Sequence, residues 1–331
     1  MIDLVDCARL LASNGKGLLA IDESIPTADK RLSEHGIEPG PAMRLKFREL
    51  FLGAEGIERY LSGAILFSET FGQKMDGKKF PAYLSSRGIE TGIKVDEGTE
   101  PFENGKELIT NGIIGLLERI KTFREGGARF SKWRAVIAIE GDHLPSSSAL
   151  LENARRIALY AHASQEAGLV PAIEPEVLLT GNHSRLRARD VIKETLSTVF
   201  AAIKEHIVDL SGLLVKTSMA LSGSETGKMD TPEEVAEDTL EALLASVPRQ
   251  VAGIVFLSGG QSPDQATENL AAIARAAKKR DVPWPLSFSF ARALQDEALT
   301  LWKGKEKNVL AARAAFLARL EKVFQASSGK A

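Results

Sequence analysis

The sequence is poor in the residues that crosslink chains or hold metals. Cys7 is the only cysteine among 331 residues, so no disulfide can form within the chain. The five histidines are scattered and form no pair at the spacing that metal ligands take on a helix or a strand. Gly-x-Ser-x-Gly is absent, and no Gly-x-Gly-x-x-Gly follows the first predicted strand. We therefore expect no metal, no dinucleotide cofactor and no activated serine.

An excess of one charge and long apolar runs are also absent. The chain has 42 Lys and Arg against 44 Asp and Glu, which argues against a nucleic-acid partner or a polybasic membrane surface. No apolar run has the length that a membrane span needs. The first 13 residues carry Asp3 and Asp6 before any basic residue, so they predict a short amphipathic helix and not a signal peptide. The expected location is cytoplasmic.

Short apolar runs recur along the whole chain. Eight of them have the composition of buried strands, and successive runs start 30 to 45 residues apart. They begin at Gly17, Ser62, Gly92, Arg129, Gly168, Gly212, Ala252 and Pro285. Each interval has room for one strand, one helix and two loops.

Helical patterns fill most of these intervals. Apolar residues at three- and four-residue spacing predict helices over 42–54, 105–125, 146–167, 187–206, 231–246, 265–279 and 308–325. Strands alternating with such helices predict crossover units and a parallel sheet. Eight units favour a closed (β/α)8 barrel, the TIM-barrel fold, over an open doubly wound sheet. Because no linker interrupts the pattern, residues 1–331 are predicted to form a single catalytic domain with a short N-terminal helix and a C-terminal helical tail.

Lys216 lies in the sixth apolar run, Gly212–Ala220, without an acidic neighbour in the sequence. Burying an unpaired ammonium is costly. Two outcomes are open at this point. The amine reaches solvent from the end of the strand, or it stays inside the barrel and becomes a nucleophile once it loses its proton.

Charged residues gather at the predicted carboxyl ends of the strands, where barrel enzymes carry their chemistry. Side chains alternate along a strand, so Lys132 and Arg134 share one face, and Glu174 and Glu176 share another. If these faces point inward, they meet Lys216 on the neighbouring strand. Packing explains such a mixture poorly, because barrel interiors favour branched apolar residues. We therefore favour the nucleophilic role.

Two further sets of residues are candidates for binding anions. Ser258, Gly259 and Gly260 form a glycine-rich turn after the seventh strand, and Ser289 and Arg292 follow the eighth, a common phosphate position in barrels. The second set shares the rim around the first, third and fourth strands: Ser24, Thr27, Lys30, Arg31, Lys94 and Arg134. Two anion sites around a nucleophilic lysine indicate a substrate that is phosphorylated at both ends.

Taken together, the motifs resemble class I fructose-1,6-bisphosphate aldolases along nearly the whole chain. The matching pieces, in order, are Gly15–Ser24, Lys30–Leu32, Ser62–Phe67, Gly92–Asp96, Lys132–Arg134, Val170–Glu176, Leu213–Lys216, Phe256–Ser262 and Ser287–Leu294. The resemblance implies a homotetrameric barrel enzyme of glycolysis and gluconeogenesis that needs no cofactor. Such an enzyme cleaves fructose 1,6-bisphosphate reversibly into dihydroxyacetone phosphate and glyceraldehyde 3-phosphate through a lysine Schiff base.

The resemblance also implies a role for each residue. Lys216 matches the Schiff-base lysine, and Glu174 matches the acid/base that moves protons as the carbinolamine loses water. Glu176 and Lys132 match residues that set the charge around Glu174, and Asp22 matches the base for the C4 hydroxyl. The remaining residues match phosphate surroundings: Ser258, Gly259 and Arg292 on the ketone side, and Ser24, Thr27, Lys30, Arg31 and Lys94 on the other, with Arg134 also lining the cleft.

Three features depart from the family pattern. Animal-type members end in a mobile tail with a terminal tyrosine that helps to protonate the enamine, whereas all three tyrosines here lie in the first half of the sequence. We expect another group or water to protonate the enamine. Pro26 and Ala291 stand where glycines are familiar in the two phosphate loops, so one loop should be stiffer and the other should bind slightly less tightly.

Two alternative functions stay open from the sequence. Another Schiff-base barrel enzyme, such as a transaldolase or a single-phosphate aldolase, would keep Lys216 as its nucleophile. A catalytically silent scaffold would keep the sites for sugar phosphates without turnover.

Overall fold

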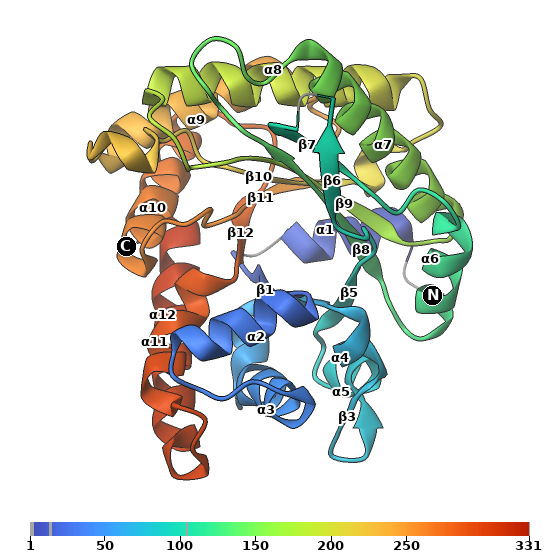
Figure 1. Ribbon diagram of the computed structural model, residues 1–331, viewed down its shortest axis with the longest axis vertical. Coiled ribbons are helices and arrows are strands. Elements are labelled where there is room, and N and C mark those ends of the chain that lie inside the picture. The colour runs from blue at the N-terminus through green and yellow to red at the C-terminus, as the bar shows by residue number, and fades with distance from the viewer. Residues whose placement is uncertain (1–2, 13–14, 104, 331) are drawn as a thin grey trace.

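A closed barrel of eight parallel strands lies at the centre of the molecule (Figure 1). The computed structural model describes residues 3–12, 15–103 and 105–330. The strand order around the barrel is β1-β12-β11-β10-β9-β8-β5-β2. The strands are β1 (Gly17–Ile21), β2 (Leu61–Leu66), β5 (Glu90–Lys94), β8 (Phe130–Ile137), β9 (Val170–Val177), β10 (Leu214–Thr217), β11 (Gly253–Phe256) and β12 (Leu286–Phe290). The predicted (β/α)8 barrel is confirmed.

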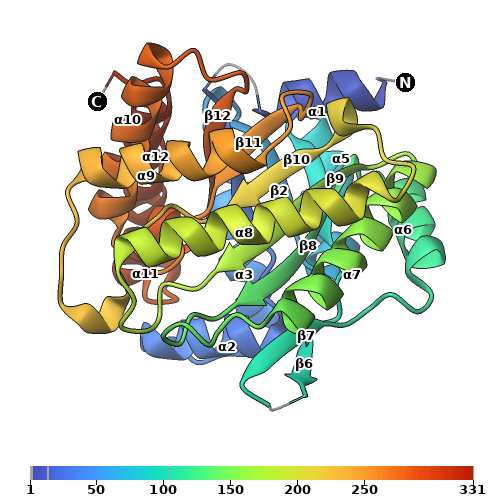
Figure 2. The ribbon, with the colours of Figure 1, turned by 90° about the horizontal axis from the view of Figure 1, so that it is seen from above.

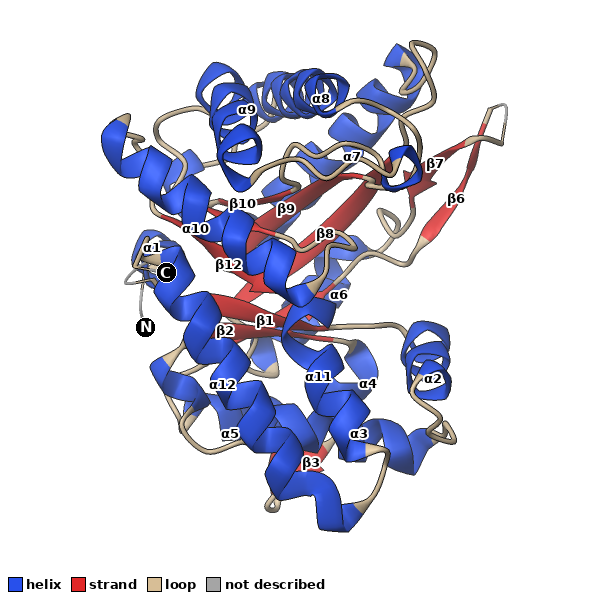
Figure 3. Ribbon diagram, turned by 90° about the vertical axis from the view of Figure 1, so that its left-hand side faces the viewer, coloured by secondary structure: helices blue, strands red, loops and turns tan. Residues whose placement is uncertain are grey.

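Helices cover the outside of the barrel (Figure 3). They are α1 (Leu4–Ala12), α2 (Ile25–Glu34), α3 (Pro41–Leu52), α4 (Ser68–Gly72), α5 (Phe80–Ser85), α6 (Leu116–Glu125), α7 (Ser147–Glu166), α8 (Arg185–Lys204), α9 (Pro232–Ser246), α10 (Pro263–Lys279), α11 (Arg292–Trp302) and α12 (Val309–Ser327). None of these helices is long and apolar enough to cross a membrane, over the part of the chain that the structure describes.

Short elements complete the chain. Two antiparallel hairpins pair β3 (Lys74–Met75) with β4 (Lys78–Lys79), and β6 (Thr99–Phe102) with β7 (Glu107–Thr110). The 3-10 turns are η1 (Ile57–Arg59), η2 (Leu210–Gly212), η3 (Ser224–Thr226) and η4 (Glu306–Asn308). Residues 1–2 and 13 of the predicted N-terminal helix, and residues 14, 104 and 331 of the predicted domain, lie outside the described residues.

The predicted helix over 105–125 is wrong in its first half. Residues 107–110 form β7, and α6 begins only at Leu116. Gly112 and Gly115 separate the two elements with φ of 113° and 68°, a left-handed backbone that does not continue a helix. Asn153 on α7 holds the strand in place, because it accepts from the Thr110 N–H at 3.3 Å and donates to the Leu108 carbonyl at 2.9 Å.

Four long helices begin directly after a capping residue. The hydroxyls of Ser146, Ser184, Thr231 and Ser262 each accept a hydrogen bond from an amide of the first helical turn. At the start of α9, Glu234 also reaches back to the Thr231 N–H and completes a capping box. A cap of this kind stabilises a helix by about 1 kcal/mol, which fixes where these helices start.

The amino end of the barrel is closed by α1. Leu18, Phe130 and Val255 from inside the barrel form one apolar cluster with Ala8 and Leu11 of the helix. Glycines let the helix approach: a Cβ on Gly253 would lie 2.3 Å from the Cβ of Ala12. In Figure 2, α1 lies at the edge of the molecule opposite α2 and the β6–β7 hairpin. The carboxyl ends of the strands therefore remain open on the α2 side.

Candidate active site

Lys216 lies inside the barrel, on β10. Its side chain is 4 % exposed, and its Nζ lies 2.9 Å from Oε1 of Glu174 on the neighbouring strand β9. A buried ammonium needs a charged partner, and Glu174 supplies one. The alternative in which the amine reaches solvent is therefore wrong.

Lys132 on β8 joins two carboxylates from different strands. Its Nζ lies 2.6 Å from Oδ2 of Asp22, which follows β1, and 3.1 Å from Oε2 of Glu174. Together with Lys216 these residues form a row of alternating charges that is almost closed to solvent. The faces of β8 and β9 point inward, as the alternation of side chains predicts.

The charges in this row stabilise one another against the cost of burial. Burial opposes the charged form of Glu174, but Lys132 and Lys216 outweigh it and hold the pKa of the carboxyl below its usual range. Asp22 is also buried, and the same two lysines lower its pKa. Burial alone would lower the pKa of Lys132, whereas Asp22 and Glu174 raise it well above the ordinary value. Both carboxylates are therefore ionised at neutral pH and able to accept a proton.

A second pair of ions lies further out on the same strands. Arg134 Nε donates to Oε2 of Glu176 at 2.5 Å, so Glu176 contacts the arginine and not the lysine row. Lys94 pairs with Asp96, whose other oxygen accepts from the Arg134 N–H at 3.3 Å. Asp96 is not among the site residues predicted from the sequence, although its place two residues after Lys94, on the same face of the chain, was the available signal.

These side chains open into a cleft of 890 Å³ at the carboxyl ends of the strands. Ser24, Thr27 and Lys30 from the start of α2 line one side of it, and the hydroxyls of Ser24 and Thr27 lie 3.0 Å apart. Lys30 is 79 % exposed at the rim, 3.9 Å from Glu34. Arg292 also lines the cleft, and among the described residues its guanidinium has no hydrogen bond or ion pair.

The cleft also contains residues that the sequence analysis missed. Arg119 and Phe123 of α6, together with Phe67 after β2, line its wall beside Lys94. The Arg119 guanidinium donates to the Val95 carbonyl at 3.2 Å and so holds the chain just after β5. The mistaken helix over 105–125 hid this arrangement, because it gave no reason for α6 to turn toward the barrel mouth.

The contacts of Arg31 differ from those expected of a residue that holds a phosphate. Its guanidinium is buried and donates at 2.6 Å to Glu23 and at 2.6 Å to Asp296 of α11. Arg48 binds the other oxygen of Glu23 at 2.5 Å. Burial opposes the charge on Glu23, but Arg48 and Arg31 hold the pKa of its carboxyl low. Arg31 borders the cleft, yet its charge already serves to join α2 to α11.

The predicted phosphate turn after β11 is built as a tight turn. The Gln261 N–H donates to the Ser258 carbonyl at 3.0 Å, and Gly259 and Gly260 have φ of 56° and 95°. Arg292 approaches this turn, because a Cβ on Gly260 would lie 3.7 Å from its guanidinium. Ser289 Oγ, on the adjacent strand, is buried and has no hydrogen-bond partner among the described residues.

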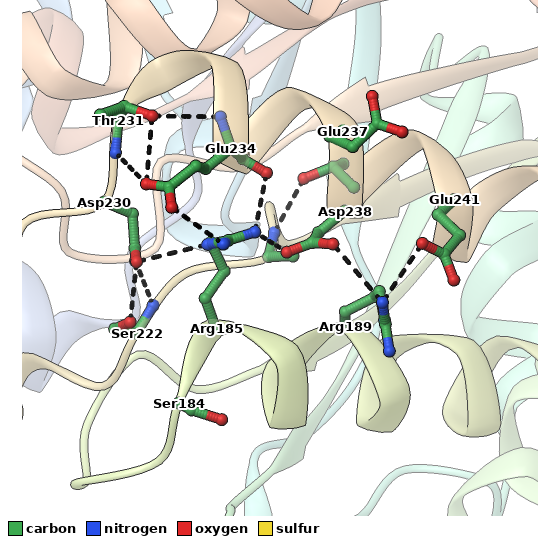
Figure 4. Close-up of polar contacts among 12 residues, drawn as sticks. Ser184, Arg185, Arg189, Ser222, Asp230, Thr231, Glu234, Glu237, Asp238 and Glu241 are labelled. Atoms are coloured by element: carbon green, nitrogen blue, oxygen red, sulfur yellow. Dashed lines mark hydrogen bonds and ion pairs between the residues drawn. The ribbon is translucent and has the colours of Figure 1, made fainter.

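The chain that follows Lys216 is anchored to α8 and α9 by a buried ion network (Figure 4). The N–H and hydroxyl of Ser222 donate to Asp230 at 2.7 and 2.9 Å. Arg185 lies 3.4 Å from Asp230 and also pairs with Asp238. In the described part of the chain, no group of three or more His, Cys, Asp and Glu side chains could hold a metal ion.

The fold and the site define a class of protein: barrel enzymes that place a buried lysine among carboxylates at the carboxyl ends of their strands. Within that class, the chain belongs to the family described as fructose-bisphosphate aldolase class-I, which it matches over residues 3–331. The resemblance stated from the motifs is confirmed.

Relatives with similar sequences carry the same name. The chain is 45 % identical to the cytosolic fructose-bisphosphate aldolase 6 of Arabidopsis thaliana over 329 residues, which cover 99 % of this chain and 91 % of the relative. It is 44 % identical to a probable fructose-bisphosphate aldolase class 1 of Xanthomonas campestris, over 90 % of this chain and 89 % of the relative. A Plasmodium falciparum fructose-bisphosphate aldolase, solved in complex with TRAP and a small-molecule inhibitor, superimposes with a TM-score of 0.95 at 39 % identity, over 99 % of this chain and 94 % of that one.

Proposed function

We propose that the protein is a class I fructose-bisphosphate aldolase that cleaves fructose 1,6-bisphosphate reversibly into dihydroxyacetone phosphate and glyceraldehyde 3-phosphate. The observation that carries this proposal is the buried row Asp22–Lys132–Glu174–Lys216, which opens into a cleft with cationic side chains at its rim. Family membership supports it. We further propose that residues 1–331 act as one catalytic domain.

In the first step, Lys216 bonds to the ketone carbon of the sugar. Its ammonium gives a proton to Glu174, 2.9 Å away, and the freed amine attacks C2. A proton passes from the attacking nitrogen to the ketone oxygen, which becomes the hydroxyl of the carbinolamine. Glu174 then returns its proton to this hydroxyl, which leaves as water, and a protonated iminium remains. The low pKa of Glu174 makes the carboxylate available, and Lys132 stabilises its charge at 3.1 Å.

In the second step, the C3–C4 bond breaks. Asp22 takes the proton of the C4 hydroxyl, the aldehyde forms, and the electrons of the broken bond move into the iminium to give an enamine. Lys132, 2.6 Å from Asp22, holds this carboxylate in its ionised form before the step. Protonation at C3 and hydrolysis of the iminium then release the ketone product and restore Lys216.

Two groups of residues would bind the phosphates. Ser24, Thr27, Lys30 and Lys94 offer hydroxyls and ammonium groups on one side of the cleft. On the ketone side, the glycine-rich turn at Ser258–Gly260, Ser289 and Arg292 offer amides, a hydroxyl and a guanidinium. Arg31 would act here through its contacts with Glu23 and Asp296.

Turnover tests the proposal directly. The purified chain should produce dihydroxyacetone phosphate and glyceraldehyde 3-phosphate from fructose 1,6-bisphosphate, measured by a coupled assay. Lys216→Met should remove that activity, because it removes the amine that bonds to the substrate. The circular dichroism spectrum of the variant should remain that of the folded barrel. A folded Lys216→Met variant that still turns over would contradict the proposal.

We also propose a cytoplasmic homotetramer. The location is supported by the cytosolic names of similar relatives, and the tetramer by the family resemblance. Light scattering on the purified protein should give a mass four times the 35.8 kDa of the chain. A monomeric mass at micromolar concentration would contradict the assembly and leave the proposed chemistry unaffected.

A further inference from the structure

Gln261 is buried beside the glycine-rich turn, and it has no role in the proposed chemistry. We propose that Gln261 is a positioning residue: its side chain fixes the orientation of the Ser258–Gly259 peptide and thereby directs the Gly259 N–H toward the ketone-side phosphate. This inference rests on the proposed function, because it deepens the account of one of its two phosphate sites.

The Ser258 carbonyl is held twice by the same residue. It accepts the Gln261 N–H at 3.0 Å and the Gln261 Nε2 at 3.0 Å. The first bond is the ordinary closure of a four-residue turn. The second is a side-chain bond that the turn itself does not need, and it fixes the direction in which the carbonyl points.

Because the peptide bond is planar, a hydrogen bond that holds the Ser258 carbonyl also fixes the direction of the Gly259 N–H. The C=O of Ser258 and the N–H of Gly259 belong to one planar unit and point in opposite directions. Because the carbonyl points toward the buried Gln261 side chain, the Gly259 N–H must point away from it. Among the described residues, neither the Gly259 N–H nor the Gly260 N–H has a hydrogen-bond acceptor within the protein.

Without the side-chain bond, only the turn bond from the Gln261 N–H would hold this peptide against rotation. Gly259 and Gly260 both have positive φ, and glycine adopts either sign of φ at little cost. Rotation of the Ser258–Gly259 unit would exchange the amide for a carbonyl oxygen, which repels a phosphate. The glycines that allow the backbone to approach an anion therefore also make this peptide easier to rotate, and the Gln261 side chain adds a second restraint.

Gln261 is itself held in place from two sides. Its Oε1 accepts from Nδ2 of Asn269 on α10 at 2.7 Å, and its Nε2 lies 3.6 Å from the sulfur of Met219. Gln261 and Asn269 are 6 % and 1 % exposed. Since Oε1 is occupied as an acceptor, the amide group is oriented with its N–H groups toward Ser258. The restraint thus runs from Asn269 through Gln261 to the phosphate turn.

Borohydride trapping with two ketones tests this role. Dihydroxyacetone phosphate carries the phosphate and dihydroxyacetone does not, whereas both form the same bond to Lys216. Gln261→Met keeps the length of the side chain and removes its N–H. We expect it to raise the half-saturating concentration of dihydroxyacetone phosphate about tenfold, the effect of losing one well-aimed hydrogen bond to a charged group. The half-saturating concentration of dihydroxyacetone should stay within about twofold, because that ketone does not use the phosphate site.

Two further variants complete the design. Gln261→Leu also removes the N–H and adds no charge beside the phosphate, so it should show the same selective loss, and it serves if the methionine variant does not fold. Gln165→Met is the matched control, because Gln165 on α7 also donates to two main-chain carbonyls, at 2.8 and 3.2 Å, but lies near η2 and away from the phosphate turn. It should change neither concentration.

The outcomes separate the two hypotheses. Wild-type protein that forms no adduct with either ketone would overturn the proposed function and this inference with it. The other outcome is an adduct at Lys216 but no selective effect of Gln261→Met. If the half-saturating concentrations of the two ketones change by the same factor, or do not change, only the role of Gln261 is overturned.

Discussion

At the scale of single residues, the site depends on ions that have been taken out of water. Lys132 contacts Asp22 and Glu174 at once, and Glu174 also contacts Lys216. Each of these charges would be expensive to bury alone. The arrangement is stable because every carboxylate in the row contacts a lysine. The same contacts keep Asp22 and Glu174 in their ionised forms, since they lower the pKa values of both carboxyls.

This arrangement predicts how stability depends on pH. Asp22, Glu23 and Glu174 are buried, yet nearby cations lower their pKa values relative to the unfolded chain. A carboxyl with a lowered pKa stabilises the folded state above its unfolded pKa, about 4, and this contribution is lost as the pH falls through the folded value. Urea unfolding should therefore give a free energy that is nearly constant from pH 7 to 5 and falls below pH 4.

A variant isolates one of these groups. Glu23→Gln cannot titrate at that position, so its free energy of unfolding should decline less steeply in acid than that of the wild type. A free energy of unfolding that increases on acidification below pH 4 would contradict the ion pairs described for all three carboxylates.

At the scale of elements, the sequence predicted strands better than it predicted the segments between them. The strands were visible because each is a short apolar run, and most helices were visible because apolar residues recur at three- and four-residue spacing. The error over 105–125 came from reading apolar spacing without the glycines that interrupt it. The β6–β7 hairpin is specified by contacts with Asn153, which lies more than forty residues away, so the local pattern carried no signal for it.

The ion network between α8 and α9 predicts a large change in stability for one arginine. Arg185→Met would leave Asp230 and Asp238 without their shared buried partner, and removing one member of a buried ion pair costs roughly 3–5 kcal/mol. Denaturant unfolding monitored by tryptophan fluorescence measures this. Lys216 itself is unchanged, so any residual activity at low temperature should keep the wild-type KM.

Arg155→Met is the matched control, on α7. Arg155 is 55 % exposed and pairs with Glu152 of the same helix at 2.8 Å, so its loss should cost about 1 kcal/mol or less. Equal losses of stability in the two variants would contradict the distinction between the buried network of Figure 4 and a surface ion pair.

At the scale of the whole molecule, barrel closure brings distant residues together. Asp22 and Lys216 are almost two hundred residues apart in the sequence, yet they lie at the two ends of one row. Asp22 contacts Lys132, Lys216 contacts Glu174, and these two central side chains contact each other, because neighbouring strands end at one face. This geometry made the lysine row predictable from the sequence. Arg31 was not predictable in the same way. Its partner Asp296 lies on the last helix but one, and nothing in the sequence indicated which face of α2 would turn toward it.

The two ends of the cleft should contribute separately to substrate binding. Arg292→Ala should raise KM about tenfold for both fructose 1,6-bisphosphate and fructose 1-phosphate, because it removes a charged donor from the ketone side. Lys30→Ala should raise KM for the bisphosphate and leave KM for fructose 1-phosphate unchanged. Steady-state assays with both sugars measure this. If Lys30→Ala raises KM equally for both sugars, the assignment of the two phosphate groups to the two ends of the cleft is wrong.

The central claim is that the Lys216 amine forms a covalent bond with the substrate ketone. The most direct measurement is peptide mapping by mass spectrometry after borohydride reduction in the presence of dihydroxyacetone phosphate. The account predicts a single reduced adduct on the peptide that contains Lys216 and none in the Lys216→Met variant. An adduct on another lysine, or catalytic turnover without any adduct, would contradict it.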